Sequence, residues 1–353
     1  MVSMQHPVTT SALLGLCAIA GFVGQWAGLP LPFLIGPLLV SATLATALPR
    51  HLPDGYVFPN WLRVTFITVI GLIIGAQVTA DLFQTLPRLG VSFSALALFV
   101  VLSHGFNYAV FRRLGGYDRA TAFYSASPGG LFEALAMGEE AGADPARLTL
   151  QQFLRVILVV TLMPIGLSLW MGAPVGSSSG MTFARDDMPW SSLPLIALAG
   201  LAGIGVGHLL RLPARQLTGP MAAAAALSIS GLYHIDMPQW LVNLAQIVVG
   251  TALGMRFTGL GPAVILRGAR LSLISVGGML LLAAAFAEAL HLFMGEPFDV
   301  MLISFAPGGV TEMALVALSL QANPALVTLH HIWRILVTVI GLALTGRLLR
   351  RYL

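Results

Sequence analysis

The stretch SASPGGLFEALAMG, residues 125–138, breaks one of the apolar regions of the chain. Proline interrupts the hydrogen bonding of a helix and paired glycines free the backbone, so Pro128-Gly129-Gly130 predicts that one helix ends here and another begins. Glu133 follows in the first turn of the second helix, where the positive end of the helix dipole favours a negative charge. What such a break can do depends on the solvent around it.

The composition indicates that this solvent is a lipid bilayer. Of the 353 residues, 57% are hydrophobic and 9% are charged, against about a quarter charged in soluble domains, and the mean hydropathy is +0.88. Apolar stretches long enough to cross about 30 Å of hydrocarbon recur along the chain. We therefore predict an all-α polytopic membrane protein. The clearest stretches are 31–48, 62–78, 91–111, 153–170, 193–210, 241–257 and 271–290.

The chain contains the same pattern twice. The skeleton of residues 125–138 returns in SFAPGGVTEMALVA, residues 304–317, and identical positions continue as far as Arg155 and its counterpart Arg334. The numbering shifts by a constant offset of 179 through this region, and the offset becomes 183 near the start of each copy. We predict two homologous membrane repeats, 11–170 and 193–349, joined by a polar linker at 171–192.

Each repeat has five clear apolar spans plus the Pro-Gly-Gly segment, which the sequence leaves open as a sixth span or a re-entrant element. An odd number of crossings turns the second copy upside down. With five crossings, most arginines collect on one side, as expected of a cytoplasmic face, whereas six crossings would place the arginines between 256 and 270 outside. We therefore predict inverted repeats of about five transmembrane helices each, with both termini in the cytoplasm of a bacterial cell and the helices in its inner membrane.

The two breaks are the predicted site. In lipid, a backbone that leaves helical geometry must lie inside the protein or along a watery cavity, and broken helices at a repeat interface are typical of secondary transporters. Arg155 and Arg334 follow the two motif glutamates at the same spacing, deep in an apolar helix, where charge is rare and usually functional. The predicted substrate- or ion-binding residues are Ser125, Pro128, Gly129, Gly130, Glu133, Arg155, Ser304, Pro307, Gly308, Gly309, Glu312 and Arg334.

A structural alternative stays open for the charged residues. Glu133 with Arg155, and Glu312 with Arg334, could be internal ion pairs that only hold helices together. Adjacent His330 and His331 point about 100° apart on a helix, so they suggest a polar lining more than a metal site. His104 is expected to be a buried, hydrogen-bonded histidine.

The sequence carries no enzyme signature. There is no Gly-rich phosphate loop, HExxH, GxSxG or clustered Cys/His set, and the single cysteine, Cys17, forms no internal disulfide. We therefore expect a protein that is not an enzyme, with no cofactor and no metal.

The two copies of the motif, with their repeated Pro-Gly-Gly, Glu and Arg, resemble the AbrB family of bacterial membrane proteins over nearly the whole chain. One family name implies regulation of gene expression, and another label implies an ammonia monooxygenase. The residues support neither a direct nucleic-acid partner nor a copper or iron ligand set, so the resemblance adds no binding residues to the site.

The leading hypothesis is a secondary transporter or exporter of a small, anionic solute, in which the arginines bind the anion and the glutamates take up a proton or cation. The alternative is a membrane regulator or sensor that affects gene expression indirectly. The expected partners are a small-molecule solute and the lipid bilayer; the oligomeric state is left open.

Overall fold

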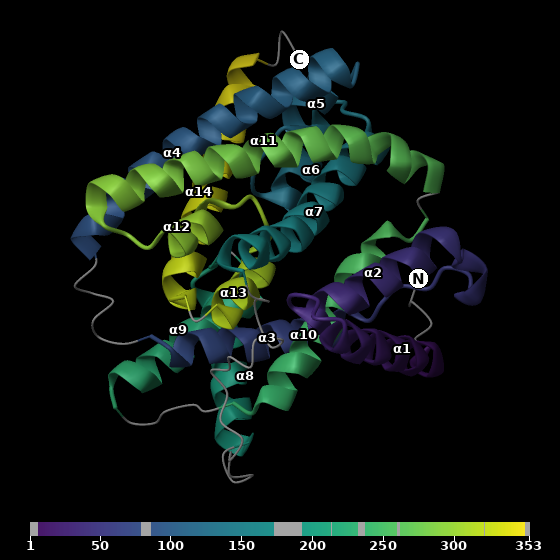
Figure 1. Ribbon diagram of the computed structural model, residues 1–353, viewed down its shortest axis with the longest axis vertical. Coiled ribbons are helices and arrows are strands. Elements are labelled where there is room, and N and C mark those ends of the chain that lie inside the picture. The colour runs from purple at the N-terminus through teal and green to yellow at the C-terminus, as the bar shows by residue number, and fades with distance from the viewer. Residues whose placement is uncertain are drawn as a thin grey trace. The chain divides into compact units, whose positions relative to one another are not determined.

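The computed structural model describes residues 6–78, 86–172, 193–212, 214–231, 237–259, 262–320 and 322–349, and in these ranges it contains helices and no strand (Figure 1). Most of the predicted linker at 171–192 lies outside them. Six of the helices are long and apolar enough to cross a membrane, which supports a polytopic membrane protein. They span Pro7–Trp26, Leu89–Leu114, Pro145–Met171, Gln239–Phe257, Val264–Met294 and Pro324–Gly346.

The helices group into two compact units, and each unit takes helices from both sequence repeats. The first unit contains α1 (Pro7–Trp26), α2 (Pro32–Ala47), α3 (Asn60–Ala76), α8 (Leu193–Leu209), α9 (Arg215–Ile229) and α10 (Gln239–Gly254). The second contains α4 (Leu86–Ala109), α5 (Arg119–Ser125), α6 (Leu131–Glu140), α11 (Pro262–Met294), α12 (Phe298–Phe305), and most of α7 (Pro145–Met171) and α14 (Pro324–Leu349). Helix α13 (Val310–Ser319) begins in the second unit and continues in the first.

The helix starts follow the sequence repeat. Helices α5, α6 and α7 begin at residues 119, 131 and 145, and α12, α13 and α14 begin at residues 298, 310 and 324, so each pair of starts is related by the offset of 179. Helix α3 begins at residue 60 and α10 at residue 239, with the same difference. Equivalent sequence positions therefore start equivalent helices.

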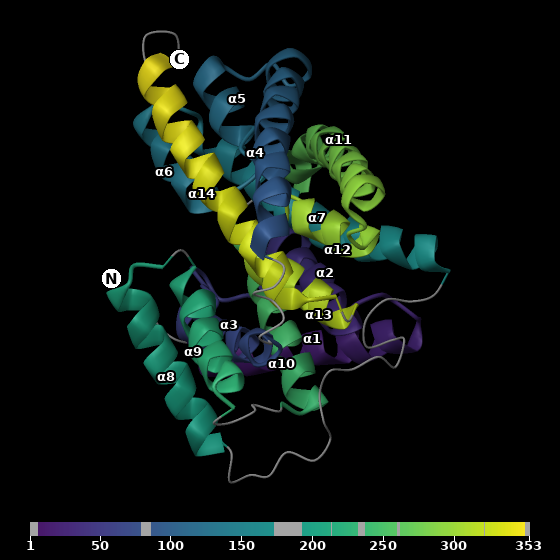
Figure 2. The same ribbon diagram turned by 90° about the vertical axis from the view of Figure 1, so that its left-hand side faces the viewer.

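In the first unit, the most extensive helix contacts join one repeat to the other, α3 with α9 and α2 with α10. Figure 2 shows α3, α9 and α8 one beside the next. A Cβ added to Gly71 or Gly75 of α3 would collide with the backbone carbonyl of Leu217 or Met221 on α9. The small residues therefore let the two backbones approach closely.

The second copy repeats this arrangement at the equivalent residues. A Cβ added to Gly250 of α10 would collide with the Leu34 carbonyl of α2, and one added to Gly254 would lie 2.6 Å from the Leu38 carbonyl. Gly250 is the counterpart of Gly71 at the offset of 179, and Leu217 is the counterpart of Leu34 at the offset of 183. Each repeat thus supplies the glycine face of one contact and the opposing carbonyls of the other.

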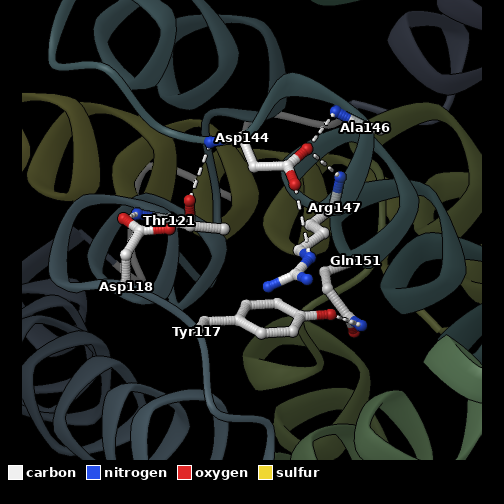
Figure 3. Close-up of polar contacts among 7 residues, drawn as sticks. All are labelled: Tyr117, Asp118, Thr121, Asp144, Ala146, Arg147 and Gln151. Atoms are coloured by element: carbon white, nitrogen blue, oxygen red, sulfur yellow. Dashed lines mark hydrogen bonds and ion pairs between the residues drawn. The ribbon is translucent and has the colours of Figure 1, made fainter.

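In the second unit, α5 and α6 form a short helical hairpin around the first Pro-Gly-Gly motif. The backbone N–H of Asp144, after α6, donates to Thr121 Oγ1 near the start of α5 at 2.7 Å (Figure 3). Gly130, which precedes α6, has a left-handed backbone with φ 60°. The chain therefore enters and leaves this segment at the same end of the hairpin, with residues 126–130 at its tip.

Candidate functional site

Two buried arginines hold the tips of the two broken segments. Arg155 of α7 and Arg334 of α14 have 5% and 1% of their surface exposed. Arg155 Nη1 donates a hydrogen bond to the carbonyl of Ser127 at 2.7 Å. Arg334 Nη1 donates to the carbonyl of Ala306, which is the repeat equivalent of Ser127, and its Nη2 donates to the carbonyl of Gly308 at 2.6 Å.

Neither arginine has a carboxylate partner among the described residues, so the ion pairs with Glu133 and Glu312 that the sequence left open are not seen there. Backbone carbonyls carry only partial charge. Burying a cation costs several kcal/mol of free energy unless an opposite charge compensates. Both guanidinium groups lie at the first broken segment, because Arg155 bonds the Ser127 carbonyl and a Cβ on Gly129 would lie 3.5 Å from Arg334 Nε. The arrangement therefore concentrates positive charge that the described part of the protein does not neutralise.

One turn before the arginines, α7 and α14 carry a second pair of equivalent side chains, Gln152 and His331, which also bond backbone carbonyls. Gln152 Nε2 donates to the carbonyl of Tyr124 at 3.0 Å. His331 Nε2 bonds the carbonyl of Ile303 at 3.0 Å. The two donors are repeat equivalents of each other, and so are the two acceptors. Equivalent polar side chains, His331 and Gln152, thus bond equivalent carbonyls in the two copies.

The same positions carry buried polar atoms that have no hydrogen-bond partner in the described residues. Buried polar groups in proteins are almost always hydrogen-bonded, so each exception needs an explanation. Here the exceptions come in repeat-related pairs, which indicates a shared cause. The pairs are Ser125 Oγ with Ser304 Oγ, Gln152 Oε1 with His331 Nδ1, and Arg155 Nε with Arg334 Nε.

The first tip lies directly against the arginine of the second repeat. A Cβ added to Gly129 would lie 3.5 Å from Arg334 Nε and 3.2 Å from Thr338 Oγ1. One added to Gly130 would lie 3.0 Å from Val339 of the same helix. The structure therefore brings Gly129 and Gly130 of one motif to Arg334 of the other repeat, within a single compact unit.

The two glutamates lie in the first turns of α6 and α13, as predicted, but they turn back toward the glycines before those helices. A Cβ added to Gly130 would lie 3.5 Å from Glu133 Oε2, and one added to Gly309 would collide with Glu312 Oε2. An acidic side chain at this position is stabilised by the free N–H groups of the helix start. Glu133 is exposed and Glu312 is half-buried, unlike the buried arginines.

The other histidines lie apart from the unpaired set. His330 Nδ1 bonds the carbonyl of Leu326 and its Nε2 bonds Ser92 Oγ, each at 2.9 Å. His104 is half-buried with its ring against Phe123 at 4.7 Å, but its buried Nε2 has no partner in the described ranges. The expected hydrogen bond is not seen at Nε2. The ring instead packs edge-on against Phe123.

Sequence reasoning missed the backbone part of the site. The carbonyls of Ser127, Ala306 and Gly308 bind the arginines, yet no side-chain pattern marks a carbonyl. The only usable signal was the Pro-Gly-Gly motif itself, since a broken helix leaves carbonyls without intrahelical partners. Chemically, two guanidinium N–H groups and two hydroxyls face no partner among the described residues, and these are groups that bind an anion.

These features define a class: a polytopic helical membrane protein with a buried cationic site at the tips of interrupted helices. Residues 52–350 match the family described as "Transition state regulatory protein AbrB", and the chain belongs to this AbrB family, as its motifs indicated. It is 26% identical over 348 residues to "Putative regulator AbrB" of Escherichia coli (strain K12), covering 97% of this chain and 94% of that protein. It is 26% identical over 347 residues to "Uncharacterized protein YhjN" of Bacillus subtilis (strain 168), covering 92% and 89%.

Proposed function

We propose that the protein is a secondary transporter or exporter of a small anionic solute, which binds between Arg155 and Arg334. The observation that carries this proposal is the pair of buried arginines at equivalent repeat positions, each with an unpaired Nε and no carboxylate partner in the described residues. Interrupted helices beside a buried site are the usual construction of secondary transporters. An anion bound there places negative charge beside both guanidinium groups and can accept hydrogen bonds from both Nε groups.

Inverted repeats form part of the proposal. Support comes from the first hairpin: because the chain enters and leaves it at one end, we take it to add no crossing. The five crossings of the first repeat are then assigned to its three long apolar helices, α1, α4 and α7, and its two shorter ones, α2 and α3. An odd number inverts the second copy and places most arginines on one side, with both termini in the cytoplasm. The repeat-equivalent contacts of Gly71 and Gly250 also fit a two-fold relation between the copies.

The site residues that form these bonds belong to one compact unit. In the proposed transport cycle, the site therefore keeps its internal geometry while access to it alternates between the two sides of the membrane. Glu133 and Glu312 at the tips remain candidates for binding a cation.

The rival function is a regulatory membrane protein that acts through a partner. Its support is the printed wording of the family and of the Escherichia coli relative, which mention regulation. In that case the protein would affect gene expression indirectly, by responding to a solute or a protein partner, and would not contact nucleic acid itself.

Reconstitution tests the proposal. The full chain is placed in vesicles of phosphatidylethanolamine and phosphatidylglycerol, and uptake of labelled acetate and nitrate is measured for the wild type, Arg155→Gln and Arg334→Gln. Each loss of a charged hydrogen bond is worth about 1.5–3 kcal/mol, so affinity should fall by about 10- to 100-fold.

The matched control is Arg147→Gln, because Arg147 is exposed and pairs with Asp144 at 3.3 Å. It should transport like the wild type. Gel filtration and thermal unfolding confirm that each variant is folded. Uptake and binding that are the same in Arg155→Gln, Arg334→Gln and the wild type would overturn the anion site.

A further inference from the structure

We propose that the site takes up one proton together with its anion, and that the proton binds Nδ1 of His331. This inference rests on the anion-binding function proposed above. It names the coupling ion and assigns it to a residue other than the two glutamates.

The hydrogen bonds of His331 fix its protonation state. Its Nε2 lies 3.0 Å from the Ile303 carbonyl, which can only accept, so Nε2 carries the hydrogen. A neutral imidazole then has a lone pair on Nδ1. That atom is buried and has no partner among the described residues, and the ring is 0% exposed. Nδ1 is therefore a proton acceptor within the site that nothing in the described protein occupies.

The charges around His331 oppose a proton when no anion is bound. On its own helix, Arg334 is one turn away and His330 is adjacent, and both act on His331 electrostatically. On α7, Arg155 acts on Arg334. Helix α12 supplies the Ile303 carbonyl near its C-terminal end. Its acidic residue, Asp299, lies in the first turn, at the other end of the helix.

An anion between the arginines removes this opposition, because it supplies negative charge close to His331. A third positive charge in a buried cationic site is unfavourable, whereas a proton that accompanies an anion leaves the net charge of the site unchanged. Each ligand therefore favours the binding of the other, and by linkage the effect is reciprocal.

The repeat supplies an internal comparison. Gln152, the equivalent of His331, makes the equivalent bond to the Tyr124 carbonyl but cannot take up a proton. The second repeat therefore differs from the first by a titratable group at this position. His330 lies next to His331, yet both of its ring nitrogens are engaged, with Leu326 and Ser92.

The experiment counts protons. Binding of nitrate and of acetate to the full chain in detergent is measured by titration calorimetry in two amine buffers of different ionisation enthalpy. Nitrate does not titrate near neutral pH, so proton uptake reports on the protein. The variants are His331→Gln, which copies the first repeat, His330→Gln as the matched control, and Glu133→Gln combined with Glu312→Gln.

The expected result is about one proton taken up per nitrate by the wild type, by His330→Gln and by the double glutamate variant, and none by His331→Gln. The wild-type affinity should fall by up to about tenfold per pH unit as pH rises, while the affinity of His331→Gln stays flat.

The outcomes separate the two proposals. Nitrate or acetate binding without proton uptake, or uptake that persists in His331→Gln, overturns the proton assignment and leaves the anion site standing. Uptake lost in the double glutamate variant also overturns it. Failure of the wild type to bind either anion overturns both proposals.

Discussion

At the scale of single residues, the first Pro-Gly-Gly motif places its two glycines against α14. Gly130 is left-handed, and a Cβ there would also lie 3.0 Å from Val339. Gly129 faces Arg334 and Thr338. Glycine is therefore needed here for backbone conformation and for close approach, and the two needs coincide at the tip of the hairpin.

Gly130→Ala should lower the stability of the protein by about 1–2 kcal/mol, because a side chain in the left-handed region costs about that much. Thermal unfolding of the purified protein in detergent measures the change. The control is Gly341→Ala in α14, where a Cβ meets no atom within 4 Å and should cause no loss of stability. Equal melting temperatures for Gly130→Ala and the control would contradict the strained position.

The sequence drew attention to the two buried arginines but did not predict the groups that they bond. Repeat alignment and the rarity of charge in apolar helices identified Arg155 and Arg334. The alternative of ion pairs with Glu133 and Glu312 is not seen in the described residues, because spacing along the chain does not fix the direction of a side chain. A glutamate in a first helical turn is already stabilised by its own helix start, so it does not need the arginine.

At the scale of elements, the Pro-Gly-Gly break was predictable but its path was not. Helices α5 and α6 have 7 and 10 residues, which at about 1.5 Å per residue is close to a full crossing if they are laid end to end. Tertiary contacts show that the segment folds back: the bond between Asp144 and Thr121, and the packing of Tyr124 with Ala134 in one core cluster. Sequence periodicity contains no information on that bond.

The same hairpin begins with a titratable cap. Asp118 Oδ1 accepts from the Thr121 backbone N–H at 2.8 Å, before the first turn of α5 (Figure 3). Slight burial raises the pKa of this carboxyl, but the hydrogen bonds that it accepts from Thr121 and from neighbouring backbone N–H groups together lower the pKa by more. The pKa therefore lies below its ordinary value of 3.8. A depressed pKa means that the cap stabilises the fold above that ordinary value. The contribution is lost as pH falls through the folded-state pKa.

We therefore expect the amides of α5 to lose protection from hydrogen exchange, corrected for intrinsic rates, as pH falls below 3.8. Asp118→Asn keeps an acceptor without a charge and should remove this pH dependence. Asp118→Ala should lower protection by about 1 kcal/mol above pH 3.8, where the wild-type cap is charged, and by less at lower pH. An α5 that is equally protected in Asp118→Ala and the wild type would show that the cap does not hold the hairpin.

At the scale of the whole molecule, the sequence repeats and the compact units divide the chain differently. The repeats were predicted from the sequence because motifs recur at a constant offset. The units were not, because each is formed by contacts between copies, such as α3 with α9 and α2 with α10. Tertiary pairing between distant segments depends on which faces meet, and the small-residue spacing of Gly71 and Gly75 indicated close packing without naming the partner.

The equivalence of these contacts can be measured. Gly71→Ala and Gly250→Ala each place a Cβ against a backbone carbonyl that cannot move aside easily, so each should cost about 1–3 kcal/mol through overpacking. Thermal unfolding should show losses of similar size, and Gly15→Ala, which meets no atom within 4 Å, should show none. A large loss of stability in one variant with none in the other would mean that the two contacts do not contribute equally to stability.

The orientation of the copies is tested by labelling equivalent positions from one side of the membrane. Cys17 is the single cysteine, so Cys17→Ser gives a background without thiols. Arg113, in the turn Val110–Leu114 that follows α4, and Leu292, near the end of α11, are both exposed and are repeat equivalents. We introduce Arg113→Cys or Leu292→Cys and treat intact cells with a membrane-impermeant maleimide.

Inverted repeats predict that Leu292→Cys is labelled in intact cells and that Arg113→Cys is labelled only after the membrane is opened, because five crossings separate the first copy from its inverted partner. A permeant maleimide that labels both variants confirms that both thiols are reactive. Labelling of both positions from the same side would mean an even number of crossings and parallel copies. The hairpin at 119–140 would then have to cross the bilayer, which the bond between Thr121 and Asp144 argues against.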